Sequence, residues 1–322
     1  MIVLSFVIGI MLSLSPNVVA QNASTNNFTM IDYPGANNTL AGGINSAGLI
    51  VGFYHDSSLH AHGFLLSSGT YTPIDYHNAT NTRASGINSA GQIVGSYEYK
   101  PNQPHGFLFS SGTYTPIDYP TANRTGATGI NDAGQIVGVY EDSSLHAHGF
   151  LFSSGTYTPI DYSNATNTLA SGINSAGQIV GVYADSSLHA HGFLFSSGTY
   201  TPIDYPGATN TLANGINNAG QIVGYYLDSS MHAHSFLLSS GTYSTIDYPG
   251  SNNTLASGIN NAGQIVGYYY GAPVGQTSGF LFSPGGAPQT TPEFGPVSPI
   301  ILAISILSII ILSVRTGFFY RP

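Results

Sequence analysis

Four His-Ala-His motifs carry the residues of this chain whose spacing best suits chemistry. Residues i and i+2 of a β-strand point to the same side, so each motif could present two imidazoles to one metal ion. An aspartate precedes each first histidine by four residues, and this set of donors would suit Zn²⁺ or Cu²⁺. The candidate ligands are His60, His62, His146, His148, His189, His191, His232 and His234.

A structural interpretation of these motifs is simpler, and it is the one we favour. Asp-Ser-Ser is an ordinary turn, and the histidines would then hydrogen-bond neighbouring backbone. Two of the six copies of this segment lack the pair, with Pro104 and His105 in one and Thr277 and Ser278 in the other. We therefore predict no cofactor, and keep a metal-binding or metal-dependent surface enzyme as the alternative.

Two segments depart from the repeated pattern and are rich in tyrosine. Aromatic residues in loops that break a symmetry are where a binding site is expected. The candidates are Tyr97, Glu98, Tyr99, Lys100, Tyr268, Tyr269 and Tyr270. The chain has no Gly-x-Ser-x-Gly, P-loop or His-Glu-x-x-His motif, so we predict that it is not an enzyme.

The elements that position these residues come from a motif, Gly-Ile-Asn-x-Ala-Gly-x-Ile-Val-Gly, that returns every 43 residues. A fixed period of this length is typical of one supersecondary unit copied around a ring or along a solenoid. Each unit predicts four short strands rich in Phe, Tyr, Ile, Val and Thr. In one unit these strands are Gly149–Ser153, Thr156–Tyr162, Leu169–Asn174 and Gln178–Tyr183. Pro159 in the second strand predicts an edge or a bulge.

The ends of the repeat array favour a closed ring. The array begins at residues 27–32 with the second strand of a unit and stops at residues 279–283 with the first strand of a unit. The last strand would therefore complete the first blade and remove two exposed edges. We predict an all-β, six-bladed β-propeller over residues 27–283, with a β-solenoid or prism as the alternative.

Two further sixfold sets of polar residues follow the same period. The aspartates of Ile-Asp-Tyr could surround a central channel as a carboxylate ring, but we expect each to tie its own strand end to backbone N–H groups. They are Asp32, Asp75, Asp118, Asp161, Asp204 and Asp247. The asparagines of Asn-x-Ala-Gly suit the first position of a turn, which explains them without a further role.

Composition and the chain ends indicate an exported, tethered protein. Only 6% of residues are charged, the formal net charge is −9 and Lys100 is the only lysine, so we predict no nucleic-acid partner. Residues 1–20 predict a signal peptide, with an uncleaved N-terminal anchor as the alternative. A linker rich in Pro and Gly at 284–296 leads to an apolar run at 297–314, just long enough to span a bilayer. Arginines place the tail at 315–322 in the cytoplasm.

Sequons for N-glycosylation support export. Five of them recur in the loop between the second and third strands of a unit, which would have to face solvent to carry glycan. They are Asn37, Asn78, Asn123, Asn164 and Asn252. The alternative is that Asn and Thr merely suit turns.

The repeated Gly-Ile-Asn-x-Ala-Gly-Gln-Ile-Val-Gly, followed by His-Gly-Phe-Leu, resembles the HAF family of extracellular repeat proteins over residues 28–283. The resemblance implies export and attaches no general biochemical activity. The namesake His-Ala-Phe is His-Gly-Phe here, as at His62, and the sixth copy has Ser278 in place of the histidine.

The C-terminal segment is similar to the PEFG-type sorting signal of archaeal surface proteins. It places Pro292, Glu293, Phe294 and Gly295 before the apolar run and arginine. The resemblance implies recognition by a membrane transpeptidase of the archaeosortase kind, with cleavage and lipid attachment. The tail at 316–322 is longer and more aromatic than in that signal, which leaves a retained transmembrane anchor as the alternative.

These observations together predict a non-enzymatic protein of the cell surface that binds or adheres. Near-identical sites around a ring favour multivalent contact, in which weak affinities combine. Envelope glycans or surface proteins are the expected partners, and a purely structural envelope component is a further alternative.

Overall fold

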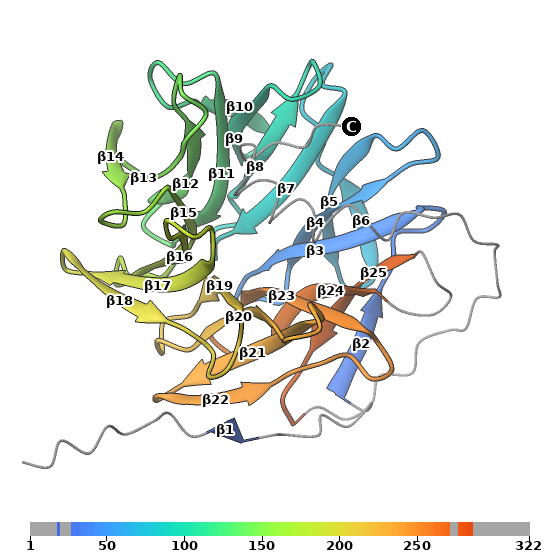
Figure 1. Cartoon of the computed structure of the whole chain (residues 1–322). Coiled ribbons are helices and arrows are strands. Elements are labelled where there is room, and N and C mark those ends of the chain that lie inside the picture. Colours follow the sequence, from blue (N-terminus) through green and yellow to red (C-terminus); the bar gives the residue numbers. More distant parts are fainter. Residues whose placement is uncertain (1–17, 20–26, 271–275, 286–322) are drawn as a thin grey trace, which may run out of the picture.

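The computed structural model describes residues 18–19, 27–270 and 276–285. Within these ranges the chain is all-β, and its strands form six sheets arranged as blades around a common axis (Figure 1). The prediction of a six-bladed β-propeller is confirmed, and the solenoid and prism alternatives are set aside.

The blades follow one another along the chain. Blade 1 consists of β3 (Asn38–Ile44), β4 (Ile50–His55), β5 (Ala61–Ser67) and β6 (Thr70–Pro73). Blade 2 consists of β7 (Asn81–Ile87), β8 (Ile93–Glu98), β9 (Pro104–Ser110) and β10 (Thr113–Ile117). Blade 3 consists of β11 (Arg124–Ile130), β12 (Ile136–Glu141), β13 (Ala147–Ser153) and β14 (Thr156–Ile160).

The second half of the ring repeats this plan. Blade 4 consists of β15 (Asn167–Ile173), β16 (Ile179–Ala184), β17 (Ala190–Ser196) and β18 (Thr199–Ile203). Blade 5 consists of β19 (Asn210–Ile216), β20 (Ile222–Leu227), β21 (Ala233–Ser239) and β22 (Thr242–Thr245). Blade 6 consists of β23 (Asn253–Ile259), β24 (Ile265–Tyr270), β25 (Thr277–Phe282) and β2 (Phe28–Ile31). The short β1 (Val18–Val19) pairs in parallel with β22.

Strands within a blade are antiparallel and run outward from the axis in chain order, as in β15-β16-β17-β18. The inner strand has a register shift in every blade, which in β15 lies between Ala170 and Gly172. The third strand of blade 3 begins at Ala147, two residues before its predicted start, because Ala147 pairs with Glu141. Pro159 lies in β14, the outermost strand of its blade. An edge strand tolerates proline, because it has a neighbouring strand on one side only and the missing N–H of proline need not break a hydrogen bond.

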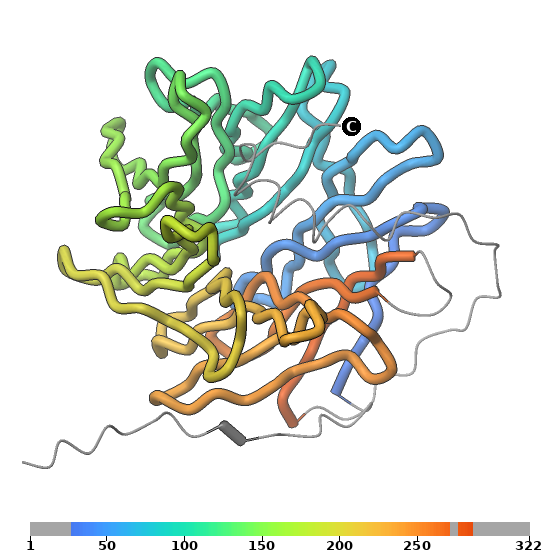
Figure 2. The backbone as a smooth tube through the Cα atoms, viewed as in Figure 1, coloured from blue at the N-terminus to red at the C-terminus, as the bar shows by residue number. Residues whose placement is uncertain are grey.

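Closure of the ring uses both ends of the repeat array. β2 pairs with β25 in the register Phe28↔Phe282 to Ile31↔Gly279, so blade 6 takes its outer strand from the start of the chain. Figure 2 shows these two segments side by side, one at each end of the colour scale. The N–H of Ser283 also donates to the carbonyl of Asn27 at 2.9 Å. The predicted closure of the ring by the two ends of the array is therefore confirmed, but the blade that they share is the last one, in which β2 is the outer strand, and not the first.

The hydrophobic core lies between neighbouring blades. Each blade buries one phenylalanine of its third strand completely, and the set is Phe64, Phe107, Phe150, Phe193, Phe236 and Phe280. Phe236 of blade 5 packs with Val180 of blade 4, so one blade covers the face of the next. Burial of one such ring stabilises the fold by about 3 kcal/mol, which is the upper end of the range for the burial of one apolar side chain.

Several predictions on the chain ends fall outside the described residues. These are most of the signal peptide at 1–20, the linker and sorting motif beyond Gly285, the apolar run at 297–314 and the tail at 315–322. Among the described residues, no helix is long and apolar enough to cross a membrane.

Candidate functional site

The two rims of the propeller differ in their side chains. We call the rim that carries residues 45–48 and their repeats the turn face. The opposite rim, with residues 32–37 and 56–60 and their repeats, is the loop face. The candidate residues from the sequence lie on or near the loop face.

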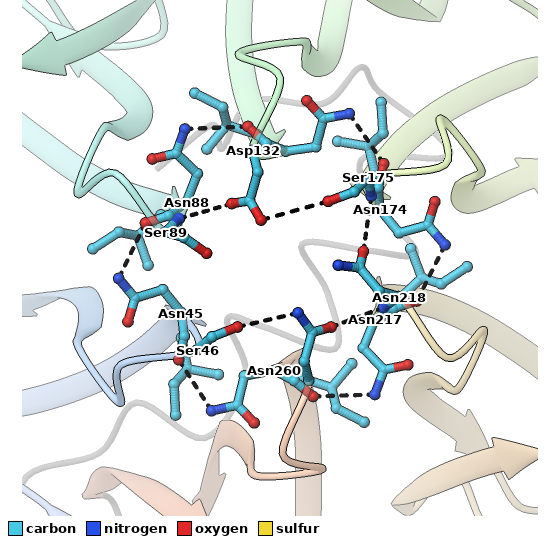
Figure 3. Close-up of a pocket in the computed structure, with 18 residues that line it drawn as sticks. Asn45, Ser46, Asn88, Ser89, Asp132, Asn174, Ser175, Asn217, Asn218 and Asn260 are labelled. Atoms are coloured by element: carbon cyan, nitrogen blue, oxygen red, sulfur yellow. Dashed lines mark hydrogen bonds between the residues drawn. The ribbon is translucent and has the colours of Figure 1, made fainter.

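The turn face is closed at its centre by a ring of asparagines (Figure 3). In blade 4, the Asn174 carboxamide oxygen accepts from the N–H groups of Ala176 and Gln178 at 3.1 and 3.0 Å. Its Nδ2 donates to the carbonyl of Asn217 in the next blade at 3.1 Å. The same bond joins all six blades, and the bond from Asn260 to Asn45 at 3.0 Å completes the ring.

This ring leaves a small polar cavity on the axis. Its volume is about 70 Å³, far below the roughly 300–1,000 Å³ usual for small-molecule sites, so it suits a few waters. Asp132 accepts from the N–H of Ser89 at 2.8 Å and so belongs to a second layer of bonds between blades. The sequence interpretation of these asparagines was incomplete, because a turn role accounts for the Oδ1 bonds and leaves out the bonds between blades.

On the loop face, four blades carry the same short loop, at residues 56–60, 142–146, 185–189 and 228–232, which we call the tip loops. In blade 1, Asp56 Oδ1 accepts from the N–H groups of Ser58 and His60 at 2.8 and 2.9 Å. These bonds hold the pKa of Asp56 below its usual range, and the bond from the His60 N–H contributes most to this effect. The carboxylate is therefore ionised near neutral pH and orders the loop.

Each tip loop carries, at its fourth position, an exposed apolar residue in an unfavourable backbone conformation. Leu59 has φ 65° and Leu145, Leu188 and Met231 have 65°, 64° and 64°. Their exposed fractions are 57%, 49%, 40% and 38%. A left-handed conformation costs a non-glycine residue about 1–2 kcal/mol, so glycine or asparagine would be more stable here. The equivalent residue of blade 2 is Asn102, with φ 61°.

A histidine and two aspartates lie beside each tip. His62 Nδ1 lies 3.0 Å from Asp75 Oδ2, and His62 Nε2 lies 3.6 Å from Asp56 Oδ2. The imidazole also stacks on Tyr54 at 5.3 Å. His148, His191 and His234 repeat this arrangement with their own aspartates. The expectation that the histidines bond to backbone was wrong, since their partners are carboxylates.

The first histidine of each motif precedes the strand, so the pair does not form a strand i, i+2 couple. His60 lies in the tip loop, 54% exposed at its side chain, and only His62 is in β5. In the part of the chain that the structure describes, no group of three or more His, Cys, Asp or Glu residues could hold a metal ion. The two-imidazole metal site therefore stays a prediction without geometric support.

The Ile-Asp-Tyr aspartates bond within their own blade and do not line the axis. Asp75, Asp118 and Asp247 accept from backbone N–H groups as predicted, whereas Asp161 and Asp204 bond to a histidine side chain. Asp75 Oδ1 accepts from the N–H of Gly63 at 3.1 Å, and Asp247 accepts from that of Ser235 at 2.9 Å. The sequon asparagines share this rim and all five are exposed: Asn37, Asn78, Asn123, Asn164 and Asn252. Exposure meets the requirement for glycosylation, which itself stays a prediction.

Asp32 in blade 6 is the exception among these aspartates, because Ser278 stands where other blades have histidine. Ser278 Oγ donates to Asp32 Oδ2 at 3.3 Å, whereas the buried Oδ1 has no hydrogen-bond partner. Burial raises the pKa of Asp32 to about 6. The protonated form is therefore favoured in the folded state, and the stability that this group contributes is lost as pH rises from its ordinary pKa of 3.8 through about 6.

Replacement of Asp32 by Asn should therefore stabilise the protein at pH 7. We expect the free energy of unfolding to rise by on the order of 1–2 kcal/mol, after discounting for partial exposure, and its pH dependence between 3.8 and about 6 to flatten. Urea denaturation at several pH values measures this. Asp118→Asn is the matched control, because Asp118 accepts from the Gly106 N–H and its replacement should not stabilise. An unchanged or lower stability of D32N at pH 7 would contradict the argument.

Some of the candidates in the tyrosine-rich segments are buried by packing, and others lie on the surface. Tyr97 and Tyr269 are buried and stack on Tyr76 and Tyr248, with ring centroids 3.6 Å apart in both pairs. Tyr54, Tyr140, Tyr183 and Tyr226 stack in the same way in the other blades. The interpretation of Tyr97 and Tyr269 as irregular loop residues was wrong, because they occupy a packing position that repeats in every blade.

The remaining tyrosine-segment candidates do not form one surface. Tyr99 is 49% exposed, and Lys100 beside it is also exposed. Tyr268 and Tyr270 are half-buried and pack in an apolar cluster with Leu227. Glu98 is buried and bonds to side chains of its own blade. Blade 1 separates these two segments, which belong to blades 2 and 6.

No family model matches this chain, and no curated protein matches its sequence. Solved structures do match. The fucose-specific lectin from Aleuria aurantia has a TM-score of 0.52 and 11% identity, over 80% of this chain and 95% of the lectin. AofleA from Arthrobotrys oligospora has a TM-score of 0.53 and 10% identity, over 83% of this chain and 92% of AofleA. TolB from Acinetobacter baumannii has 0.51 and 12%, over 63% of this chain and 52% of TolB. At these identities the likeness shows a shared propeller fold alone.

Proposed function

We propose that this protein is a non-enzymatic, multivalent binding protein that recognises glycans with the tip loops of its loop face. The observation that carries the proposal is the exposed Leu or Met in a left-handed conformation at four equivalent tips. A strained apolar residue in a position that suits glycine is retained against stability, which favours a role in binding. Four blades carry this strained apolar residue on the same rim.

The chemistry beside each tip suits a sugar. A carboxylate such as Asp75 accepts hydrogen bonds from hydroxyl groups, and the neighbouring imidazole can donate or accept. Leu59 offers an apolar contact for the C–H face of a sugar ring. Each set is small and open, so a single site would bind weakly. Four sites on one rim can raise the combined avidity by about 10²–10⁴ over one site.

The comparisons support this proposal at the level of fold. Several of the similar propellers are lectins, and one of them is described as fucose-specific. SapL1, also similar, is described in complex with α-methyl fucoside. Propellers of this size thus serve as scaffolds for sugar recognition, although the residues of those sites are not carried over to this chain.

We further propose that the protein is exported and held at the cell surface by its C-terminal segment. Either a sorting transpeptidase cleaves this segment and attaches the protein to lipid, or the segment stays as a transmembrane anchor. The HAF-type repeat and the PEFG-type tail support this location. Asn27 and Ser283, at the two ends of the repeat array, are bonded to each other on the turn face, beside the turn at Gly263. A tether from Ser283 would leave the turn face toward the membrane and present the tip loops outward.

Replacement of Leu59, Leu145, Leu188 and Met231 by glycine should separate binding from stability. Each change relieves a strained conformation, so we expect an equal or higher melting temperature. We expect retention on immobilised glycans to fall at least about 100-fold, as the avidity of four sites is lost. A glycan array with the full-length chain finds the ligand, and surface plasmon resonance compares the variants.

Asn102→Gly is the matched control, since it changes the equivalent loop of blade 2 without removing an apolar tip. It should leave retention unchanged. Equal retention by the fourfold glycine variant would show that the tips are not the binding site, and the absence of any glycan ligand would count against the function itself.

A further inference from the structure

Five of the six loops that join consecutive blades on the loop face contain an Asn-x-Thr sequon, and these sequons occur in two registers. In the early register, at Asn78 and Asn164, the sequon ends at the residue before the inner strand. In the late register the sequon lies two residues further along, so its last two residues are the first two of the inner strand. The late sequons begin at Asn37, Asn123 and Asn252.

The late sequon of blade 1, which begins at Asn37, is part of the folded ring. The side chain of Asn38 accepts from the N–H of Thr277 in blade 6 at 3.0 Å. Thr39 is only 1% exposed, and its hydroxyl oxygen accepts from the N–H of Tyr33 at 2.9 Å. This tripeptide therefore cannot move away from the fold without breaking a contact between two blades.

The other late sequons have an equally inaccessible threonine. Thr125 and Thr254 are each 1% exposed, and each accepts from the backbone N–H of a tyrosine, at 3.1 and 3.0 Å. Both are also paired with the second strand of their blade. The motif requires a hydroxyl at its third position, so the transferring enzyme must reach it. Loss of one buried hydrogen bond makes such an opened state about tenfold rarer or more.

The early sequons lie outside the strands and are open to solvent. Asn78 and Asn164 are exposed, and their side chains form no hydrogen bond to any described residue. Thr80 is exposed and Thr166 is half-buried, and their hydroxyls donate to backbone carbonyls at 2.8 and 3.2 Å. The middle residue of both is alanine, whose side chain makes no hydrogen bond. An enzyme can therefore bind the whole motif without unpairing a strand.

We propose that Asn78 and Asn164 are N-glycosylated on the folded protein and that the three late sequons are not. Nδ2 of each asparagine forms a bond to the anomeric carbon of a sugar activated as a phosphate ester. The phosphate leaves with the electron pair of the broken C–O bond, and Nδ2 gives up one proton. The two glycans would lie on the loop face, between blades 1 and 2 and between blades 3 and 4. This inference does not depend on a binding role for the tip loops.

The loop between blades 4 and 5 provides a matched test, because it shares the turn but has no sequon. Gly207, with φ +80°, is equivalent to Asn78, and Thr209 is equivalent to Asn37. Gly207→Asn therefore creates an early sequon, and Thr209→Asn creates a late one. Other blades have asparagine at each of these positions, so both variants should fold.

Peptide mass spectrometry of the full-length chains, expressed in cells that transfer N-glycans, measures the glycosylated fraction at each asparagine. We expect at least about tenfold higher occupancy at Asn78 and Asn164 than at the late sequons. The new site should be modified in Gly207→Asn and unmodified in Thr209→Asn. Synthetic peptides of residues 35–41 and 76–82 should be modified to a similar extent by membranes of the same cells, because outside the fold both registers are open.

Three outcomes would overturn the proposal. The first is the absence of glycan at Asn78 and Asn164. The second is equal occupancy in the two registers, which would mean that transfer precedes folding. The third is a matching preference between the two synthetic peptides, which would assign the difference to the local sequence and not to the fold.

Discussion

A chain that ends at Gln276 is expected to melt at least about 10 °C below one that ends at Gly285. The shorter chain lacks β25, which lies between β24 and β2 and joins the two ends of the ring. It loses Phe280, which is completely buried, and a burial of this kind is worth about 3–5 kcal/mol. Two strand edges also become exposed. Thermal unfolding followed by circular dichroism measures the difference.

The chain that ends at Gly285 is the matched control, since it keeps every strand of blade 6 and both chains lack residues 286–322. We expect hydrogen exchange in the shorter chain to rise first in blade 6 and in the two blades beside it. Equal melting temperatures for the two chains would mean that closure by β25 adds no stability, contrary to the ring described above.

Gly181→Ala should be the most damaging single substitution of those considered, with a loss of more than about 4 kcal/mol or failure to fold. A methyl group at this position would overlap the carbonyl oxygen of Leu169 and lie 2.7 Å from the buried ring of Phe193. Neither neighbour can move, because Leu169 is paired in the inner strand and Phe193 is fully buried. Urea denaturation gives the free energy of unfolding.

Gly177→Ala in the adjacent turn is the matched control. Gly177 has φ +74°, and no atom lies closer than 4.0 Å to the place that an alanine methyl group would take. Only the backbone penalty of about 1 kcal/mol is therefore expected. A similar loss in both variants would show that the close approach of strands at Gly181 does not decide the stability of the blade.

Strand number, blade number and closure could be predicted from the sequence because their signals are local and repeat in register. Short runs of β-branched and aromatic residues between Gly, Asn and Ser set the strands, and Pro159 indicated an edge strand. The complementary fragments at residues 27–32 and 279–283 indicated which strand closes the ring, since only one pairing completes six equal units.

Contacts between blades could not be predicted in this way, because they join residues about 20 or 43 positions apart whose burial depends on the closed ring. Asn174 has the sequence context of a turn residue, yet its Nδ2 binds the neighbouring blade. Tyr97 belongs by sequence to an unusual loop, yet it is buried and stacks on Tyr76 in the connection between blades 1 and 2.

The sequence by itself determined the period, the strands and the closed ring, for which local turn chemistry and hydrophobic alternation suffice. Only the tertiary structure decided which polar residues meet. It separated His60 from the strand of His62, exposed Leu59 in a strained turn, and joined Asn174 to Asn217 of the next blade. The physical reason is that the inner strands of all six blades surround one axis, so residues from different repeats become neighbours there.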